Sequence, residues 1–280
     1  MKNLLARPGL IRALCATLAL LAPLASKAQP EEGNEIEIGA AVLNFGYKEF
    51  NDSGKLLDRE DGNLPGAALR LSRARKPWLF AGDVSYYGGD VTHDGRTDTN
   101  VPFTSRTGEK IVDMAVHAEY WPATPAGLNY ALYAGAGYRR WERDIRPAGA
   151  AVNGLFETYQ WWFGFLGAKL TLSQSPQVRW LLDARAVRLV RPSITVDSHG
   201  VNDNVRLDLG ERWGGRLALP WRYTMSRTAG LTVEPFVESF ELGGSATVPR
   251  TSNGAVVGTI NEPRSETRNY GLVISVSQRF

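Results

Sequence analysis

Charged side chains recur at every second position in several segments of this sequence. In residues 178–190, for example, Arg179, Asp183 and Arg185 share one parity, while apolar residues hold the other. Successive side chains of a β-strand point to opposite faces, so such a strand has one charged face. Two chemistries fit a charged interior: a filling network of salt bridges, or a narrow arginine-lined passage that favours small anions. We favour the filling network and assign to it Asp83, Asp113, His117, Glu119, Arg139, Arg179, Asp183, Arg185, Arg206, Asp208, Arg212, Arg216, Glu234 and Glu238.

Few residues in the sequence suggest catalysis. His199 lies in Asp197-Ser198-His199, and a carboxylate with a histidine can activate water for hydrolysis. The surrounding segment is rich in Gly, Asp and Asn, so we interpret it as a solvated loop. The sequence contains no nucleotide-binding loop, zinc-ligand spacing or helical calcium loop. We therefore predict no catalytic residues, no cofactor and no metal site.

The first 28 residues have the pattern of a secretory signal peptide. Lys2, Arg7 and Arg12 precede an apolar stretch over 13–25, and small residues flank Lys27 at the expected cleavage site. Residues 29–280 are then the mature domain. Removing the four basic residues of 1–28 changes the formal net charge from +3 to −1, which gives no reason to expect nucleic-acid binding. Cys15 is the only cysteine, so the mature chain is predicted to have no disulfide.

Period-two alternation predicts an all-β chain of about ten strands. We expect the apolar parity to slip near Leu43 and to blur after Gly164. The predicted strands are 35–47, 64–73, 77–87, 110–121, 128–141, 156–172, 178–190, 204–221, 231–242 and 270–280.

The predicted connections alternate in length. The long ones are 48–63, 88–109, 142–155, 191–203 and 243–266, and the short ones are 74–77, 122–127, 173–177 and 222–230. Outer-membrane barrels have short periplasmic turns and longer extracellular loops. The pattern therefore predicts a closed antiparallel transmembrane β-barrel with both ends in the periplasm.

The final strand carries the clearest resemblance. Tyr270, Leu272, Ile274, Val276 and Phe280 share one face, and the chain ends on the aromatic residue. This segment resembles the C-terminal strand of bacterial outer-membrane β-barrels. The resemblance implies an integral protein of the Gram-negative outer membrane that contacts lipids and lipopolysaccharide. It also implies that these five residues are an assembly signal for the barrel-assembly machinery, and we expect a monomer.

Aromatic residues are predicted to form two belts at the level of the lipid headgroups. The first belt is Trp78, Tyr120, Trp121, Tyr130, Trp180, Trp221, Tyr223 and Phe280; the second is Tyr47, Tyr86, Tyr138, Trp141, Tyr159 and Tyr270.

The functional prediction is a structural or porin-like barrel with a mostly filled lumen and at most a narrow passage for small solutes. Two alternatives stay open. One is a surface hydrolase, since the chain loosely resembles proteases of the omptin type. The first long connection, however, has no matching pair of aspartates. A lipid A-modifying enzyme is a further possibility within this class. The other is an adhesin that binds through the second and fifth long connections.

Overall fold

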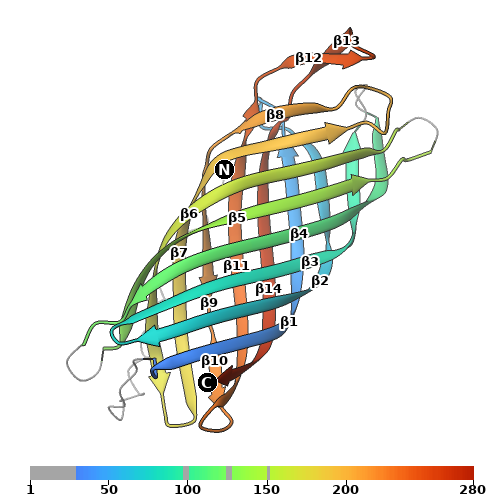
Figure 1. Cartoon of the computed structure of the whole chain (residues 1–280). Helices are drawn as coiled ribbons and strands as arrows, with labels where there is room; N and C mark the ends of the chain where they lie inside the picture. The colour runs from blue at the N-terminus through green and yellow to red at the C-terminus, as the bar shows by residue number, and fades with distance from the viewer. Residues whose placement is uncertain (1–29, 97–100, 124–127, 150–151) are drawn as a thin grey trace, which may run out of the picture.

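Antiparallel strands make up nearly all of the computed structural model, which describes residues 30–96, 101–123, 128–149 and 152–280 (Figure 1). The predicted signal peptide, residues 1–28, lies outside the described residues. Within the described ranges, no helix is long and apolar enough to cross a membrane. The strands are β1 (Gly33–Phe50), β2 (Leu56–Arg75), β3 (Trp78–Arg96), β4 (Pro102–Tyr120), β5 (Tyr130–Ile145), β6 (Leu155–Gln174), β7 (Val178–Asp197), β8 (Val205–Gly210), β9 (Trp213–Ala218), β10 (Trp221–Thr224), β11 (Ala229–Ser245), β12 (Val248–Ser252), β13 (Ala255–Ile260) and β14 (Arg264–Arg279).

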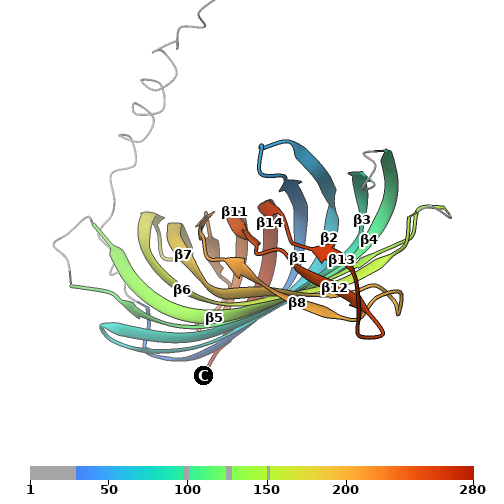
Figure 2. The ribbon, with the colours of Figure 1, turned by 90° about the horizontal axis from the view of Figure 1, so that it is seen from above.

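The strands close into one ten-stranded barrel, as the sequence predicts. β8, β9 and β10 follow one another between β7 and β11 and together replace a single long strand. β14 pairs with β1, and Ile36 lies opposite Gln278. Figure 2 shows the sheet curving round on itself. Closure pairs the backbone groups of every barrel strand, which a lipid environment requires.

The strands are longer than predicted and absorb most of the predicted long connections. β1 and β2 are joined by 51–55, and β3 and β4 by 97–101, where we expected 48–63 and 88–109. Likewise 146–154 and 198–204 replace 142–155 and 191–203. The connection predicted as 243–266 begins after Ser245 and contains a separate β12–β13 hairpin. We call this side of the barrel the loop end, and the side with the short turns and the last residue the turn end (Figure 1).

The outward face changes character along the strands, which explains the underestimated lengths. Near the turn end the outward side chains are apolar, as at Phe80, Val84 and Met114. Towards the loop end they become Asp90, Thr92 and similar polar residues. An aromatic ring marks the change on several strands, and we call this level the polar boundary. It runs through Tyr86, Tyr138, Trp162 and Tyr270. On β3 and β4 the apolar segment is Trp78–Tyr86 and Val112–Tyr120, close to the roughly 9–11 residues that cross a bilayer.

The inward face changes in the opposite sense. β1 keeps one alternation throughout: Glu35 and Glu37 point inward near the turn end, and Leu43 and Phe45 point inward near the loop end. The predicted slip at Leu43 is therefore wrong. β6 keeps its alternation through Gly164, with Phe163 and Phe165 both inward, but its register against β7 shifts between Thr171 and Ser173, which confirms the expected irregularity after Gly164. On β1 the apolar residues change faces because the filling of the barrel changes, while the backbone phase does not.

A real break in phase occurs in β7. Gln160 and Trp162 of β6 pair with Ser193 and Val190, so β7 contains an extra residue at Arg191, whose φ is 50°. This β-bulge shifts the inward parity of β7 from Leu189 to Ile194. The neighbouring strand breaks at the same level, between β8 and β9. Consequently Leu207, the register partner of Ile194, is buried inside.

Part of the predicted aromatic belts is also corrected. Tyr86 and Tyr270 on one belt, and Trp78, Tyr120, Trp180, Tyr223 and Phe280 on the other, are exposed on the outer face. Tyr47, Trp141 and Tyr159 are instead fully buried inside the barrel, and so is Trp121. The first three lie beyond the polar boundary, where aromatic and aliphatic side chains fill the interior together with buried charged ones.

Candidate functional site

Ionic and aromatic side chains fill the loop-end half of the barrel. We call this group the lumen plug and define it as Tyr47, Glu49, Glu60, Glu109, Trp141, Arg143, Glu157, Tyr159 and Glu262, all of which are buried. Most of these residues lie on β1, β2, β4, β5 and β6, and Glu262 precedes β14. The plug therefore joins strands from around the barrel.

Arg143 is the centre of the plug. Its side chain is 1% exposed, and its guanidinium lies 2.7 Å from Glu157, 3.0 Å from Glu60 and 3.3 Å from Glu49. These acids belong to β6, β2 and β1. The guanidinium also lies 4.3 Å from the centre of the Tyr47 ring, a cation–π contact. One cation thus links strands on different sides of the lumen.

The tyrosines extend this network towards the last strand. Tyr47 donates its hydroxyl hydrogen to Glu49 at 2.5 Å, and Tyr159 donates to Glu262 at 2.5 Å. The Trp141 ring stacks on Tyr159 with centroids 4.8 Å apart. Burial, together with the nearby carboxylates of Glu49 and Glu157, raises the pKa of Glu262 well above its ordinary value. The fold therefore favours the protonated form of Glu262.

A second ionic group lies below the plug, towards the turn end. Arg139 contacts Asp113 at 2.5 Å and Glu238 at 3.3 Å, which links β5 to β4 and β11. Aromatic rings fill the rest of this level. A Cβ added at Gly137 would lie 2.4 Å from the Phe163 ring, so the glycine lets the ring lie directly on the barrel wall.

A third group surrounds Glu119, which is 1% exposed. Its carboxylate lies 3.0 Å from Arg70 and 3.0 Å from His117, accepts a hydrogen bond from Trp121 at 3.0 Å, and contacts Lys169. His117 also lies 3.2 Å from Asp83. His117 and Glu119 are two residues apart on β4, and their side chains converge within hydrogen-bonding distance.

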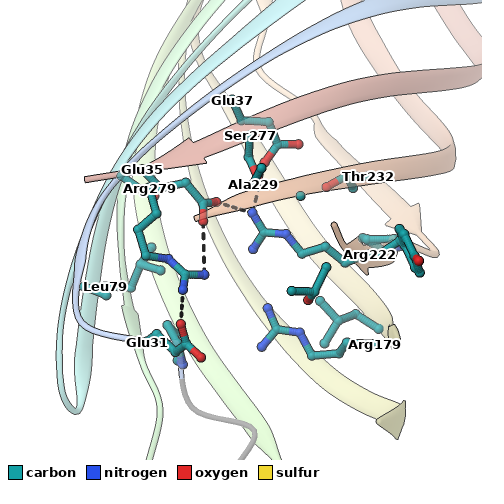
Figure 3. A pocket seen from close by; sticks show the side chains of 18 of the residues that line it. Glu31, Glu35, Glu37, Leu79, Arg179, Arg222, Ala229, Thr232, Ser277 and Arg279 are labelled. Atoms are coloured by element: carbon teal, nitrogen blue, oxygen red, sulfur yellow. Dashed lines mark hydrogen bonds and ion pairs between the residues drawn. The ribbon is translucent and has the colours of Figure 1, made fainter. Parts of the chain in front are cut away.

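Below these groups the lumen opens. A cavity of about 360 Å³ lies at the turn end, and we call it the turn-end chamber. A cavity of about 180 Å³ lies above it and shares Arg70, Lys169 and Asp183 in its lining. Within the chamber Arg222 contacts Glu35 and lies 3.4 Å from Glu37, and Arg279 contacts Glu31 (Figure 3). Arg179 and Arg222 extend into the same space (Figure 3).

Most of the predicted interior charges do lie inside the barrel. The cavities and the groups above them contain Asp83, Asp113, His117, Glu119, Arg139, Arg179, Asp183, Arg185, Arg216, Glu234 and Glu238. Arg206, Asp208 and Arg212 do not belong to this set, because all three are exposed. The breaks at Arg191 and between β8 and β9 reverse the parity that the sequence suggested. Sequence reasoning also missed Arg70, Lys169, Arg222 and the whole lumen plug.

The predicted loop histidine makes only a local contact. His199 is exposed, has a φ of 53°, and donates its backbone N–H to the Asp197 carboxylate at 2.8 Å. This geometry is that of a turn. A closer histidine–carboxylate pair lies elsewhere: His93 Nδ1 is 2.8 Å from Glu60, with both side chains buried. The sequence could have indicated this pair. If the inward-facing alternation of β2 and β3 is extended past the polar boundary, Glu60 and His93 both point into the barrel.

The closed barrel, with its apolar outer band and charged interior, defines an integral outer-membrane β-barrel protein of bacteria. No protein-family model matches the chain, and no curated protein matches its sequence. Among solved structures, the outer membrane protease OmpT from Escherichia coli is similar in fold, with a TM-score of 0.59 and 9% identity over 91% of this chain and 100% of that chain. The translocator domain of the autotransporter NalP from Neisseria meningitidis matches with a TM-score of 0.48 and 12% identity, over 96% of this chain and 94% of that chain. At these identities the likeness extends to the fold alone.

Proposed function

We propose that the protein is a structural outer-membrane barrel whose lumen is closed to ions by the lumen plug. The observation that carries the proposal is Arg143, which lies within 3.3 Å of carboxylates from three strands and is almost completely buried. Separating these groups would leave charges unpaired at low dielectric, so the closed state is strongly favoured. We place the turn end at the periplasm, because periplasmic turns are the short ones.

Planar-bilayer conductance of the refolded protein tests this proposal. We expect no single-channel openings from the wild type. A variant combining Trp141→Ala, Arg143→Ala and Tyr159→Ala with Arg139→Ala and Phe163→Ala should conduct in discrete steps, because it removes large side chains from the plug and from the filled level below it. Arg140→Ala, on the outer face of the same strand, is the matched control and should stay closed. Regular openings in the wild type, with correct folding shown by a heat-modifiable gel mobility, would contradict the closed barrel.

A second candidate function is hydrolysis at the loop end, favoured by the His93–Glu60 pair. A Cβ added at Gly95 would lie 2.6 Å from His93 Nε2 and 2.9 Å from an oxygen of Asp58, so a second carboxyl group lies near the ring nitrogen that does not contact Glu60. A histidine oriented in this way can act as a general base. It ranks second because the ring is 3% exposed. Cleavage of peptide or lipid A substrates by the wild type, abolished in His93→Ala, would support it. Equal activity in the two proteins would exclude this residue.

A further inference from the structure

Two pairs of arginines face each other across neighbouring strands of the inner wall. Arg179 of β7 lies directly opposite Arg222 of β10, and Arg185 of β7 lies directly opposite Arg216 of β9. Arg179 and Arg222 line the turn-end chamber, and Arg185 and Arg216 line the cavity above it, which shares lining residues with the chamber. Like charges directly opposite each other on adjacent strands are destabilising. Carboxylates of the protein contact one member of each pair, Arg222 and Arg216, and a bound anion would offset more of the repulsion.

In the lower pair, Arg222 has donors available for a further partner. Both carboxylate contacts of Arg222 use Nη2, so Nη1 and Nε are left for a further partner. In Figure 3 the guanidinium groups of Arg179 and Arg222 extend in the same direction into the turn-end chamber. The planar fork of a guanidinium matches the geometry of carboxylate and phosphate oxygens. The chamber volume of about 360 Å³ is at the small end of the usual range for small-molecule sites.

In the upper pair, Arg185 and Arg216, one buried donor lacks a hydrogen-bond partner. Arg216 is 2.5 Å from Glu234, but the buried Nε of Arg185 has no hydrogen-bond partner among the described residues. Arg185 instead lies over the Phe165 ring, 5.2 Å from its centre. A buried polar donor without a partner is unfavourable. An anion that moves up from the chamber would meet a second cationic position here.

We propose that the turn-end chamber binds a small oxyanion, a carboxylate or a phosphate, between Arg179 and Arg222, with Arg185 and Arg216 as a second position. The route of entry rests on the proposed function, because a plug at the loop end leaves the turn end as the way in and out. Binding at the arginine pair itself does not depend on that closure.

Calorimetric titration of the refolded full-length protein with inorganic phosphate and, separately, with succinate tests the site at constant ionic strength. We expect saturable binding of at least one anion by the wild type. Arg179→Gln and Arg222→Gln should each weaken it by about tenfold or more, since charge-assisted hydrogen bonds contribute about 1.5–3 kcal/mol. Arg188→Gln is the matched control, because Arg188 lies on the same strand as Arg179 but is paired with Glu211. This variant should bind the anion as tightly as the wild type does.

The outcomes separate the possibilities. Phosphate alone, succinate alone, or both binding with loss in the two variants supports the site and identifies its anion. Absence of saturable binding of both anions to heat-modifiable wild type overturns it, and so does an equal loss in Arg188→Gln. Conductance tests the closed barrel separately from the anion site. A wild type that conducts but binds an anion through Arg179 refutes the closed barrel and leaves the anion site standing.

Discussion

Replacing Arg143 with methionine tests the lumen plug most directly. The substitution keeps an unbranched side chain of similar reach but removes the cation that lies within 3.3 Å of Glu49, Glu60 and Glu157. Removing one partner of a buried ion pair typically costs about 3–5 kcal/mol, because the remaining charge is left without compensation. We therefore expect the free energy of unfolding to fall by about 3–5 kcal/mol, roughly two to three and a half powers of ten in the folding equilibrium.

Equilibrium urea unfolding in lipid vesicles, followed by tryptophan fluorescence, measures this change. Adding Glu60→Gln and Glu157→Gln to Arg143→Met should recover part of the loss, since the amides carry no charge. Arg140→Met is the control; it breaks only a half-exposed contact with Glu142 and should cost about 1 kcal/mol or less. A loss below about 1 kcal/mol in Arg143→Met, or an equal loss in Arg140→Met, would refute the account of the plug.

Three further predictions concern other parts of the barrel. Because the pKa of Glu262 is raised in the fold, its contribution to stability is complete at acidic pH and is lost as the pH rises through the folded-state pKa. Thermal midpoints should therefore fall with rising pH, and Glu262→Gln should flatten this dependence. An unchanged slope in the variant would contradict the assignment. Gly137→Ala should cost about 1–3 kcal/mol in urea unfolding, since its Cβ would lie 2.4 Å from the Phe163 ring; a neutral effect would mean that the ring moves freely. Deleting Phe280 should reduce the heat-modifiable fraction in outer membranes, by the resemblance to other outer-membrane barrels, and undiminished insertion would argue against an assembly signal there.

The sequence was sufficient for the barrel but only for half of its interior. Near the turn end, apolar residues such as Ile274 face lipid and charged ones such as Arg179 face inward, so period-two alternation identifies both faces. Beyond the polar boundary the outer face is polar, and the inner face mixes apolar, aromatic and paired charged residues, so alternation no longer identifies the faces. The expectation that aromatic residues at this level face lipid places Trp141 and Tyr159 outside, whereas both are buried inside.

Two kinds of error came from non-local causes. Arg206, Asp208 and Arg212 were assigned inward by extending one parity through residues 204–221, but the chain breaks between β8 and β9. That break matches the extra residue at Arg191 on the neighbouring strand, and register between strands is not visible in one segment. Two partners of Arg143, Glu49 and Glu60, come from strands far apart in the sequence, so only closure of the barrel brings them together.

The polar boundary divides the outer surface of the barrel into a part that requires a lipid or detergent environment and a part that is compatible with water. Below Tyr86 and Tyr270, apolar surface faces hydrocarbon, and a bound detergent belt is needed to keep it in solution. Above them, aromatic and aliphatic side chains such as Phe45 and Leu207 are buried from water by a polar shell, as in an ordinary soluble protein. Stripping the detergent should therefore cause the lower surfaces of neighbouring molecules to aggregate while the upper half stays folded. Substitutions on the upper outer face should be as well tolerated as those on any water-exposed sheet.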